Sequence, residues 1–457
     1  MSNPHDSFLD TLPTGWNYDR LKDVAAINAA SLPADTDPDY EFDYLEISNV
    51  DYHGIVDPQA IERLRYEDAP SRARRRVAKN CTLISSVRPN LQAVAFADNH
   101  RKDFICSTGF NVVQPAEHKL WPKFAYYALI SEGGRQYFEA TAKGVGYPAV
   151  DDKDFNSFPV PLPPVAEQER IAAYLDASCA ALDAAVAAKR RQLDTLDALV
   201  ETTIFNAVAF GLRDGAEQRA TGAVFLPEIP REWRFERLKS VASIRYGLGQ
   251  PPGELDSGVQ MIRATDIDAG TIRREGLLRI DPEELPSERN PYLKADEIIV
   301  VRSGAYTGDS AIVPPDLEGC VAGYDMVVTV NRGSPRFVAY ALLSRYVLDG
   351  QIFLLTLRAA QPHLNAEELG SVRLAIPPTR KEQETIADFL DTKLAEVKRI
   401  AAGIEAQITT LTAYRKSLIH ECVTGQRRIT EPPSPSGSGG RGADGRRVNT
   451  KVDVAEP

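Results

Sequence analysis

The sequence predicts an α+β protein of two similar globular α/β domains in tandem, separated by two long coiled-coil helices. Three observations support this architecture. The chain of 457 residues contains one sequence pattern twice, each copy ends in a long segment of helical periodicity, and the part before it consists of short β-like runs. The predicted boundaries are 1–160 and 212–374 for the domains, 161–211 and 375–425 for the helices, and 426–457 for a disordered tail.

The repeat is clearest where each copy begins. Residues 12–27 read LPTGWNYDRLKDVAAI and residues 229–244 read IPREWRFERLKSVASI, so Trp16 is matched by Trp233 and the same Arg-Leu-Lys follows. Further matches keep the same order along the chain. They are Gly109-Phe110-Asn111 with Gly323-Tyr324-Asp325, and Tyr127-Ala128-Leu129 with Tyr340-Ala341-Leu342. This order indicates a tandem duplication of one structural unit.

The end of each copy predicts a long helix. Residues 163–210 begin with Pro-Pro and continue through Glu-Gln-Glu, Ile-Ala, an aromatic residue and Leu-Asp, and the segment from residue 377 repeats this order. Seam residues in both segments alternate spacings of three and four, the a/d signature of a coiled coil. The predicted seam contains Leu182, Val186, Leu193, Leu196, Val200, Leu394, Val397, Ile404, Ile408, Leu411 and Leu418. A helix of roughly 38 residues spans about 57 Å, so we expect these helices to act as spacers. Lys189 and Arg415 are polar seam positions that can fix the register.

The globular parts contain short runs of β-like residues separated by Gly, Pro and Asp. The predicted strands are residues 44–50, 82–87 and 104–113 in the first copy, and 260–267, 297–301 and 325–330 in the second. One short helical segment follows in each copy, at 123–132 or 336–349. The pattern lacks the regular alternation of strand and helix found in a doubly wound sheet, and it is typical of an α+β fold.

Composition narrows the class of protein. No uninterrupted apolar run reaches about 18 residues and the N-terminus lacks a basic and apolar signal, so we expect no membrane span and a cytoplasmic location. The five cysteines and six histidines are scattered, without C-x-x-C spacing, which predicts reduced thiols and no metal site. After residue 425 the chain is rich in Pro, Gly and Ser, a composition that favours disorder.

Catalytic motifs are missing from the sequence. It contains no G-x-x-x-x-G-K-[ST] phosphate loop, no H-E-x-x-H and no G-x-S-x-G, and it lacks the Asn/Asp-Pro-Pro-aromatic motif that an adenine methyltransferase would need. We therefore expect a non-catalytic chain without a cofactor of its own.

Recognition of DNA is the chemistry that remains. The net charge of −11 argues against it at first sight, because phosphate contacts depend on Lys and Arg. The cations are nevertheless clustered, and they recur in both copies with aromatic residues nearby. Arginine and glutamine also pair with guanine and adenine edges. The candidate DNA-binding residues are Arg72, Arg74, Arg75, Arg76, Lys79, Arg88, Lys143 and Tyr147 in the first copy, and Arg263, Arg273, Arg274, Arg302, Tyr306, Arg358, Gln361 and His363 in the second.

The whole arrangement resembles the specificity subunit of type I restriction-modification systems. The resemblance covers residues 12–425. It rests on the two tryptophan entry segments with Leu-Lys, on PLPPVAEQERIAAYLD at 161–176 and on AIPPTRKEQETIADFLD at 375–391. It implies that each domain is a target recognition domain that reads one half of a split DNA site. It also implies that the repeated helices pack antiparallel as a spacer, which gives the chain pseudo-twofold symmetry.

The resemblance also implies partners. Double-stranded DNA, two methyltransferase (modification) subunits and motor-nuclease (restriction) subunits are expected, and S-adenosylmethionine, Mg and ATP are expected in those subunits rather than here. Two alternatives remain open. A coiled-coil adaptor between proteins would share the helices without binding DNA, and a complete DNA enzyme would need the cofactor or metal motif that this sequence lacks.

Overall fold

The computed structural model describes residues 12–50, 56, 59, 61–87, 93–98, 103–144, 148–249, 252–286, 290–356 and 363–429. The chain divides into two compact units. The first consists of Met1–Ala188 and Gln407–Pro457, and the second of Lys189–Ala406. Each unit therefore contains one globular part and a portion of both long helices. The domain boundaries predicted from the sequence stay predictions, and most of the predicted tail, from residue 430 onward, lies outside the described residues.

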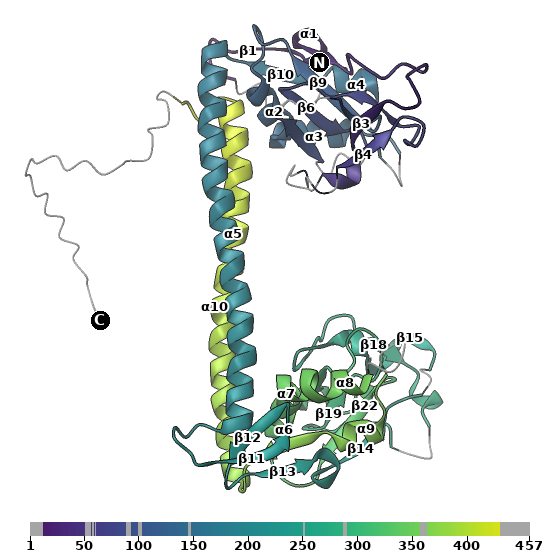
Figure 1. Ribbon diagram of the computed structural model, residues 1–457, viewed down its shortest axis with the longest axis vertical. Coiled ribbons are helices and arrows are strands. Elements are labelled where there is room, and N and C mark those ends of the chain that lie inside the picture. The colour runs from purple at the N-terminus through teal and green to yellow at the C-terminus, as the bar shows by residue number, and fades with distance from the viewer. Residues whose placement is uncertain are drawn as a thin grey trace, which may run out of the picture. The chain divides into compact units, whose positions relative to one another are not determined.

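Both predicted long helices are present (Figure 1). Helix α5 is Val165–Phe210, with 46 residues, and α10 is Arg380–Val423, with 44 residues. Each is followed by a glycine in the left-handed conformation, Gly211 at φ 78° and Gly425 at φ 71°, as is common where helices end.

Helix α5 differs in one respect from the sequence expectation. An 18-residue window within it has a mean hydropathy of 1.4, so by length and composition alone this helix could cross a membrane. The expectation counted uninterrupted apolar runs, whereas the many alanines of α5 raise its mean hydropathy between charged residues. In each unit, residues near one end of α5 share a hydrophobic cluster with residues of α10, and 22% of the apolar window is buried.

The first unit contains two four-stranded sheets and a strand pair. The pair is β1 (Asn17–Arg20) with β10 (Pro159–Leu162). One sheet has the order β2 (Ala25–Ile27), β9 (Phe110–Pro115), β6 (Cys81–Ser85), β7 (Val94–Ala97). The other has the order β4 (Glu62–Arg65), β3 (Glu41–Leu45), β8 (Phe104–Ser107), β5 (Ala73–Arg76). Its shorter helices are α1 (Leu21–Val24), α2 (Pro122–Ile130), α3 (Glu132–Thr141) and α4 (Asp152–Asn156).

The second unit has a similar set of strands. Its larger sheet has the order β14 (Ala242–Tyr246), β22 (Met326–Val330), β19 (Ile298–Val300), β20 (Ser310–Ile312). A smaller sheet has the order β18 (Leu278–Ile280), β15 (Glu254–Ile262), β21 (Val321–Ala322). The remaining pairs are β13 (Arg234–Arg237) with β23 (Arg373–Ile376), β11 (Gln218–Ala223) with β12 (Leu226–Pro230), and β16 (Ile267–Asp268) with β17 (Thr271–Ile272). Its shorter helices are α6 (Pro335–Leu342), α7 (Arg345–Val347), α8 (Phe353–Thr356) and α9 (Ala366–Ser371).

The same topology occurs in both units, which confirms the tandem duplication. In the first unit β2 follows the entry segment and pairs with β9, which contains the end of the repeated Gly-aromatic-Asn/Asp triplet, and β9 pairs with β6. In the second unit β14 follows the entry segment and pairs with β22, which directly follows the triplet, and β22 pairs with β19. The parallel pair β3 and β8 is matched by the parallel pair β15 and β21. Strand β5 of the first unit carries the clustered arginines and pairs with β8. At the matching edge of β21, the described residues of the second unit form a single antiparallel bridge, Tyr292 with Val321.

Several element predictions were wrong in extent. The strand predicted at 44–50 ends at Leu45, where a 3-10 turn over Ile47–Asn49 follows. The run predicted at 104–113 is two strands, because Thr108 and Gly109 form a turn between them. The prediction of a single short helix in each copy was also wrong, since each unit has further short helices around its sheets.

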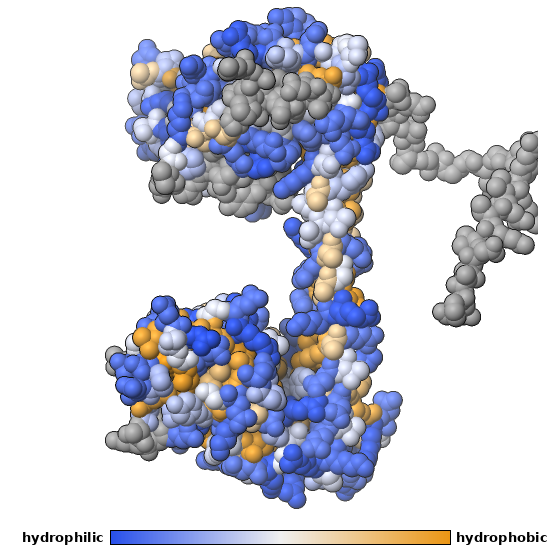
Figure 2. Space-filling view, turned by 180° about the vertical axis from the view of Figure 1, so that it is seen from behind, coloured by the Kyte–Doolittle hydropathy of each residue, from blue (hydrophilic) through white to orange (hydrophobic). Residues whose placement is uncertain are grey.

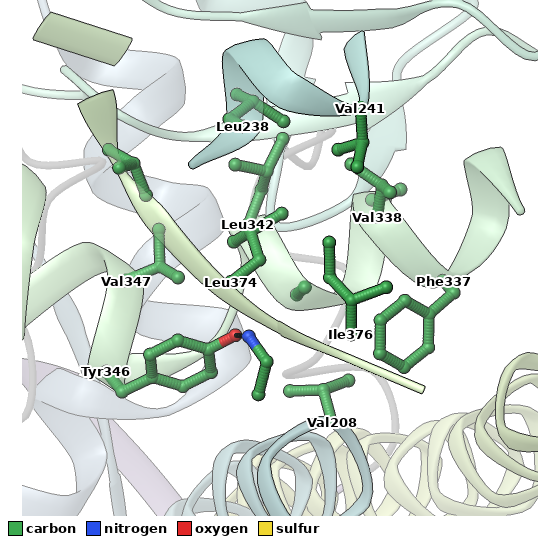
Figure 3. Packing of buried hydrophobic residues seen from close by; sticks show 14 of the residues in the cluster. Val208, Leu238, Val241, Phe337, Val338, Leu342, Tyr346, Val347, Leu374 and Ile376 are labelled. Atoms are coloured by element: carbon green, nitrogen blue, oxygen red, sulfur yellow. Dashed lines mark hydrogen bonds between the residues drawn. The ribbon is translucent and has the colours of Figure 1, made fainter. Parts of the chain in front are cut away.

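The ends of the long helices complete the cores of the units. In the second unit Val208 of α5 lies beside Ile376 of β23 and Phe337 of α6 (Figure 3). In the first unit Leu175 of α5 and Leu418 of α10 belong to one buried cluster with the globular part. Because each core uses the start of one long helix and the end of the other, the two helices run antiparallel within each unit.

A buried glutamine explains the repeated Glu-Gln motif. The Nε2 of Gln168 donates to the carbonyl of the first proline of the Pro-Pro pair at 2.8 Å and to that of Lys119 at 3.0 Å, while its Oε1 accepts from the Trp121 N–H at 2.7 Å. Gln383 makes corresponding bonds to its own Pro-Pro pair at 3.0 Å and to the Ser334 N–H at 2.7 Å. Both side chains are buried, and each fastens the start of a long helix to the residue before α2 or α6.

A tyrosine–aspartate bond explains a second repeated motif. The Tyr127 hydroxyl in α2 donates to Asp176 Oδ1 of α5 at 2.7 Å, and the Tyr340 hydroxyl in α6 donates to Asp391 of α10. Burial, together with the neighbouring carboxylate, raises the pKa of both tyrosines. The repeated Tyr-Ala-Leu and Leu-Asp sequences therefore mark one contact between the globular part and its long helix.

Large side chains are exposed on the second unit. Figure 2 shows hydrophobic residues gathered on the face of this unit that is seen there. Among its exposed side chains, Phe353 and Leu354 are adjacent on α8. Tyr306 and Tyr324 are also exposed, at 59% and 48%. This unit therefore offers aromatic rings to a ligand as well as charged groups.

Candidate nucleic-acid interface

Strand β5 carries the arginine cluster predicted in the first unit, and its alternation separates the side chains. Arg75 points inward, where its Nη1 donates to Asn28 Oδ1 at 2.8 Å, to Asn111 Oδ1 at 3.0 Å and to the Phe110 carbonyl. Burial lowers the pKa of Arg75. These contacts join β5 to the neighbouring sheet, so the candidate Arg75 has a structural role.

The other arginines around β5 contact either a carboxylate or an aromatic ring. Arg72 forms an ion pair with Glu46. Arg74 lies over the ring of Tyr66, 4.6 Å from its centroid, and Arg76 lies 5.8 Å from the centroid of Tyr40. Neither Arg74 nor Arg76 pairs with a carboxylate among the residues that the structure describes. Their charges stay available to an anionic ligand.

The remaining candidates of the first unit do not join this group. Lys79 is exposed. Lys143 forms ion pairs with Asp151 and, at 3.0 Å, with Asp154, and its hydrogen bond lowers the pKa of Asp151. Arg88 and Tyr147 lie outside the described residues.

Three candidate arginines of the second unit fasten its own loops. Arg263 binds Asp266 through two nitrogens at 3.0 and 3.1 Å. Arg274 binds Asp316 in the same way at 2.7 and 3.2 Å. Arg273 donates to the carbonyl of Thr265. Carboxylates neutralise Arg263 and Arg274, which makes these two weak candidates for DNA contact.

Arg302 has a different environment. Its guanidinium lies between two tyrosine rings, 4.6 Å from the centroid of Tyr246 and 4.3 Å from that of Tyr324. Its Nη2 is 3.0 Å from His363 Nε2. We call Arg302, Tyr246, Tyr324 and His363 the Arg302 stack. Two candidates from the sequence, Arg302 and His363, are thus brought together, and the exposed Tyr306 lies four residues after Arg302. Arg358 and Gln361 lie outside the described residues.

The sheet explains how these side chains meet. Tyr246 at the end of β14 and Val300 at the end of β19 both pair with Met326 at the beginning of β22. Residues just beyond those strand ends must therefore lie close together at the same end of the sheet. Gly247 is required here, because a Cβ on it would lie 2.2 Å from the Gly323 carbonyl oxygen.

A buried carboxyl lies under the Arg302 stack. Asp325 is 2% exposed, and its Oδ1 accepts from the backbone N–H of Arg302 at 3.3 Å. Burial raises the pKa of Asp325 to about 6. In the repeated triplet the corresponding residue of the first unit is Asn111, which is also buried. The position thus tolerates an uncharged amide in one copy and carries an acid in the other.

Replacing Asp325 by asparagine should stabilise the second unit at neutral pH. The pKa of about 6 in the folded state lies above the ordinary value of 3.8 for this group, so the folded carboxyl holds its proton more tightly. The unit therefore loses stability as pH rises from about 4 through 6. The amide has no such loss. We expect D325N to be more stable than the natural chain by about 2 to 3 kcal/mol at pH 7.5 and equally stable near pH 4.

Urea unfolding followed at the tryptophans and by hydrogen exchange of β22 measures this difference in free energy. Asp256→Asn, at an exposed position of the same unit, is the control and should change stability by less than about 0.5 kcal/mol. A D325N effect of equal size at pH 5 and pH 8 would contradict the assignment.

The predicted seam residues of α5 and α10 are divided between the two units. In the first unit these are Leu182, Val186, Ile408, Leu411 and Leu418, and in the second Leu193, Leu196, Val200, Leu394, Val397 and Ile404. All are buried or half-buried, whereas most positions between them are exposed. The polar seam residue Arg415 has its Nε 3.0 Å from Asp183 Oδ1. All five cysteines are buried and unpaired, and no group of metal ligands occurs within the described ranges.

Comparison with known proteins identifies the family. A family model described as the type I restriction modification DNA specificity domain matches residues 13–193 and again residues 230–410. The chain belongs to this family. The two matched stretches are the two copies predicted from the sequence, so the predicted resemblance is confirmed.

Members of the type I specificity family are similar along most of this chain. The MjaVIII specificity subunit of a type I restriction enzyme from Methanocaldococcus jannaschii is 22% identical over 315 residues, which cover 67% of this chain and 70% of the relative. A solved structure described as showing assembly and conformational transition of a type I system has a TM-score of 0.73 at 21% identity, covering 91% of this chain and 99% of that one. The HsdS subunit from Thermoanaerobacter tengcongensis has a TM-score of 0.52 at 21% identity, covering 91% and 98%.

As a type I specificity subunit, the chain is not itself an enzyme.

The sequence analysis did not predict the tyrosines whose rings contact the arginines. These are Tyr40, Tyr66, Tyr246 and Tyr324. Only Tyr324 carried a signal, because it belongs to the repeated Gly-aromatic-Asn/Asp triplet.

Proposed function

We propose that this chain reads an asymmetric bipartite DNA site, one half with each unit, and positions the modification subunits, and the restriction subunits where present, on that DNA. The observation that carries this proposal is the double match to the DNA specificity domain. Two similar units in one chain suit two half-sites, and because their surfaces differ the halves should differ in sequence.

Arginines that are exposed or half-buried in both units support DNA contact. Arg74 and Arg76 in the first unit and Arg302 in the second are held by tyrosine rings, and their charges are not cancelled by carboxylates in the part of the chain that the structure describes. Local positive groups of this kind are compatible with the net charge of −11, since phosphate contacts depend on the local field. Basic surfaces on the partner subunits would supply further contacts.

The chemistry is assigned to the partners in this proposal. Two modification subunits would bind S-adenosylmethionine, restriction subunits would use Mg and ATP, and the whole complex would act on double-stranded DNA in the cytoplasm. The lack of catalytic motifs in the sequence supports this division. The alternative of a coiled-coil adaptor that binds no DNA has no support from the family match.

A map of methylated adenines across the genome tests the proposal. Cells with the chain and its modification subunits should methylate one bipartite sequence, and cells lacking only this chain should lose methylation at that sequence. Reintroducing the gene is the control and should restore the same sequence. A methylation pattern that is unchanged without the chain would contradict the proposal.

A further inference from the structure

The Arg302 stack separates one arginine from the other candidates of the second unit. Arg263 and Arg274 are each bound through two nitrogens by a carboxylate. Arg302 forms no ion pair with a carboxylate in the described part of the chain, although Asp325 lies below its backbone. An arginine that is kept half-buried without a partner carboxylate loses hydration and gains no ion pair, and the two tyrosine rings offset only part of that cost. Its position therefore indicates a ligand that accepts hydrogen bonds.

The stack also fixes the orientation of the guanidinium. Rings lie within 4.6 Å and 4.3 Å of it, and stacking aligns a planar guanidinium with an aromatic face. Its Nε is buried without a hydrogen-bond partner, and Nη2 contacts His363. Arg302 as a whole is half-buried, and its Nη1 forms no hydrogen bond among the described residues, so the end with Nη1 and Nη2 stays available to a ligand. That end carries two parallel N–H donors in a fixed plane.

We infer that Arg302 reads a guanine in the half-site bound by the second unit, by donating two hydrogen bonds to O6 and N7 of that base. This inference rests on the proposed function and names a contact within it. Guanine presents two acceptors side by side in the major groove, and arginine meets them with its planar fork. A phosphate would also accept these bonds, but phosphate contacts do not require a fixed plane, and mobile surface side chains commonly make them. A clamped guanidinium is suited to a base edge.

The neighbouring side chains are consistent with a base contact. His363 is exposed beside the guanidinium, and Tyr306, Tyr324 and Tyr246 are 59%, 48% and 38% exposed. Tyr324 and His363 offer polar groups beside the arginine, while the Tyr246 hydroxyl accepts from the Ala366 N–H at 2.9 Å. The Arg302 stack thus presents one arginine among aromatic side chains, which differs from a uniformly basic surface.

The test uses the complete complex of this chain with its modification subunits. Its methylation of a DNA library with a randomised second half-site is compared for the natural chain and for Arg302→Lys. Lysine keeps a cation between the rings, which preserves the fold, but it lacks the planar fork. We expect the natural complex to prefer guanine at one position about 10- to 100-fold. R302K should lose that preference at this position only, with the first half-site unchanged. Arg274→Lys, whose arginine is held by Asp316, is the matched control and should keep the full preference.

A second measurement has a first arm on the natural complex, which does not depend on how a variant folds. Replacing each guanine of the second half-site by 7-deazaguanine removes its N7 acceptor. One such replacement should weaken binding by the natural complex about 10-fold or more, and the R302K complex should bind both DNAs equally. A half-site without guanine, or an unchanged preference in R302K, would overturn the inference. The inference would also be overturned if R302K bound every sequence more weakly by the same factor and with a shallower salt dependence. That result would indicate a phosphate contact. If the natural complex showed no bipartite preference at all, the proposed function itself would fail.

Discussion

Replacing Gln168 by alanine is expected to destabilise the first unit by about 3 to 5 kcal/mol. The side chain is fully buried and satisfies three backbone groups, two carbonyls and the N–H of Trp121. Alanine would leave these groups unpaired in the interior, and each unpaired group costs about 1 to 3 kcal/mol, less where water enters. The start of α5 would then separate from α2. Hydrogen exchange of residues 120–130 and 165–175 in increasing urea measures the loss.

Two further variants show whether the effect is local. Gln383→Ala should weaken the second unit in the same way and leave the first unchanged. Gln192→Ala, at an exposed position of α5, should change stability by less than about 0.5 kcal/mol. If Gln168→Ala cost no more than Gln192→Ala, the buried amide would not be what fastens the helix.

Gly425→Ala should destabilise the first unit by about 3 kcal/mol. Gly425 has φ 71°, where a side chain costs about 1 to 2 kcal/mol. A Cβ would also lie 2.5 Å from Pro13 Cγ and 3.2 Å from Trp16 Cη2, so the end of α10 would push the entry segment away. Calorimetry of the whole chain, with tryptophan fluorescence for the entry segment, measures this change.

Gly215 supplies a control for backbone strain alone. Its φ of 72° is nearly the same, and no atom lies within 4 Å of the Cβ that would be added. Gly215→Ala should therefore cost about 1 kcal/mol. Equal costs at the two glycines would show that the contact between α10 and the entry segment contributes nothing.

The sequence predicted the framework well because the framework is repetitive. Spacings of three and four residues identify a helix seam wherever they persist, and the two copies confirmed each other. The roles of the repeated residues were hidden, however. Nothing in the sequence shows that the glutamine of the Glu-Gln pair turns inward to Trp121, or that Tyr127 reaches Asp176, since those partners lie 47 and 49 residues away.

The candidate site could be predicted only as a list of residue types. Arg274 and Arg302 look alike in the sequence, yet one is bound by Asp316, 42 residues away, and the other is held by Tyr246 and Tyr324. Which arginines are paired with a carboxylate depends on which strands and loops the fold brings together. Arg75 turns inward because side chains alternate along β5. Four candidates, Arg88, Tyr147, Arg358 and Gln361, lie outside the described residues, and their contact with DNA stays a prediction.

The central claim is that each unit reads its own half of the DNA site. It is tested most directly by exchanging residues 27–158 for those of a related specificity subunit with a different target and mapping methylated adenines in cells. This exchange keeps both long helices and the whole second unit. The account predicts that one half of the methylated sequence changes to that of the donor subunit while the other half stays as it was. A change in both halves, or in neither, would contradict it.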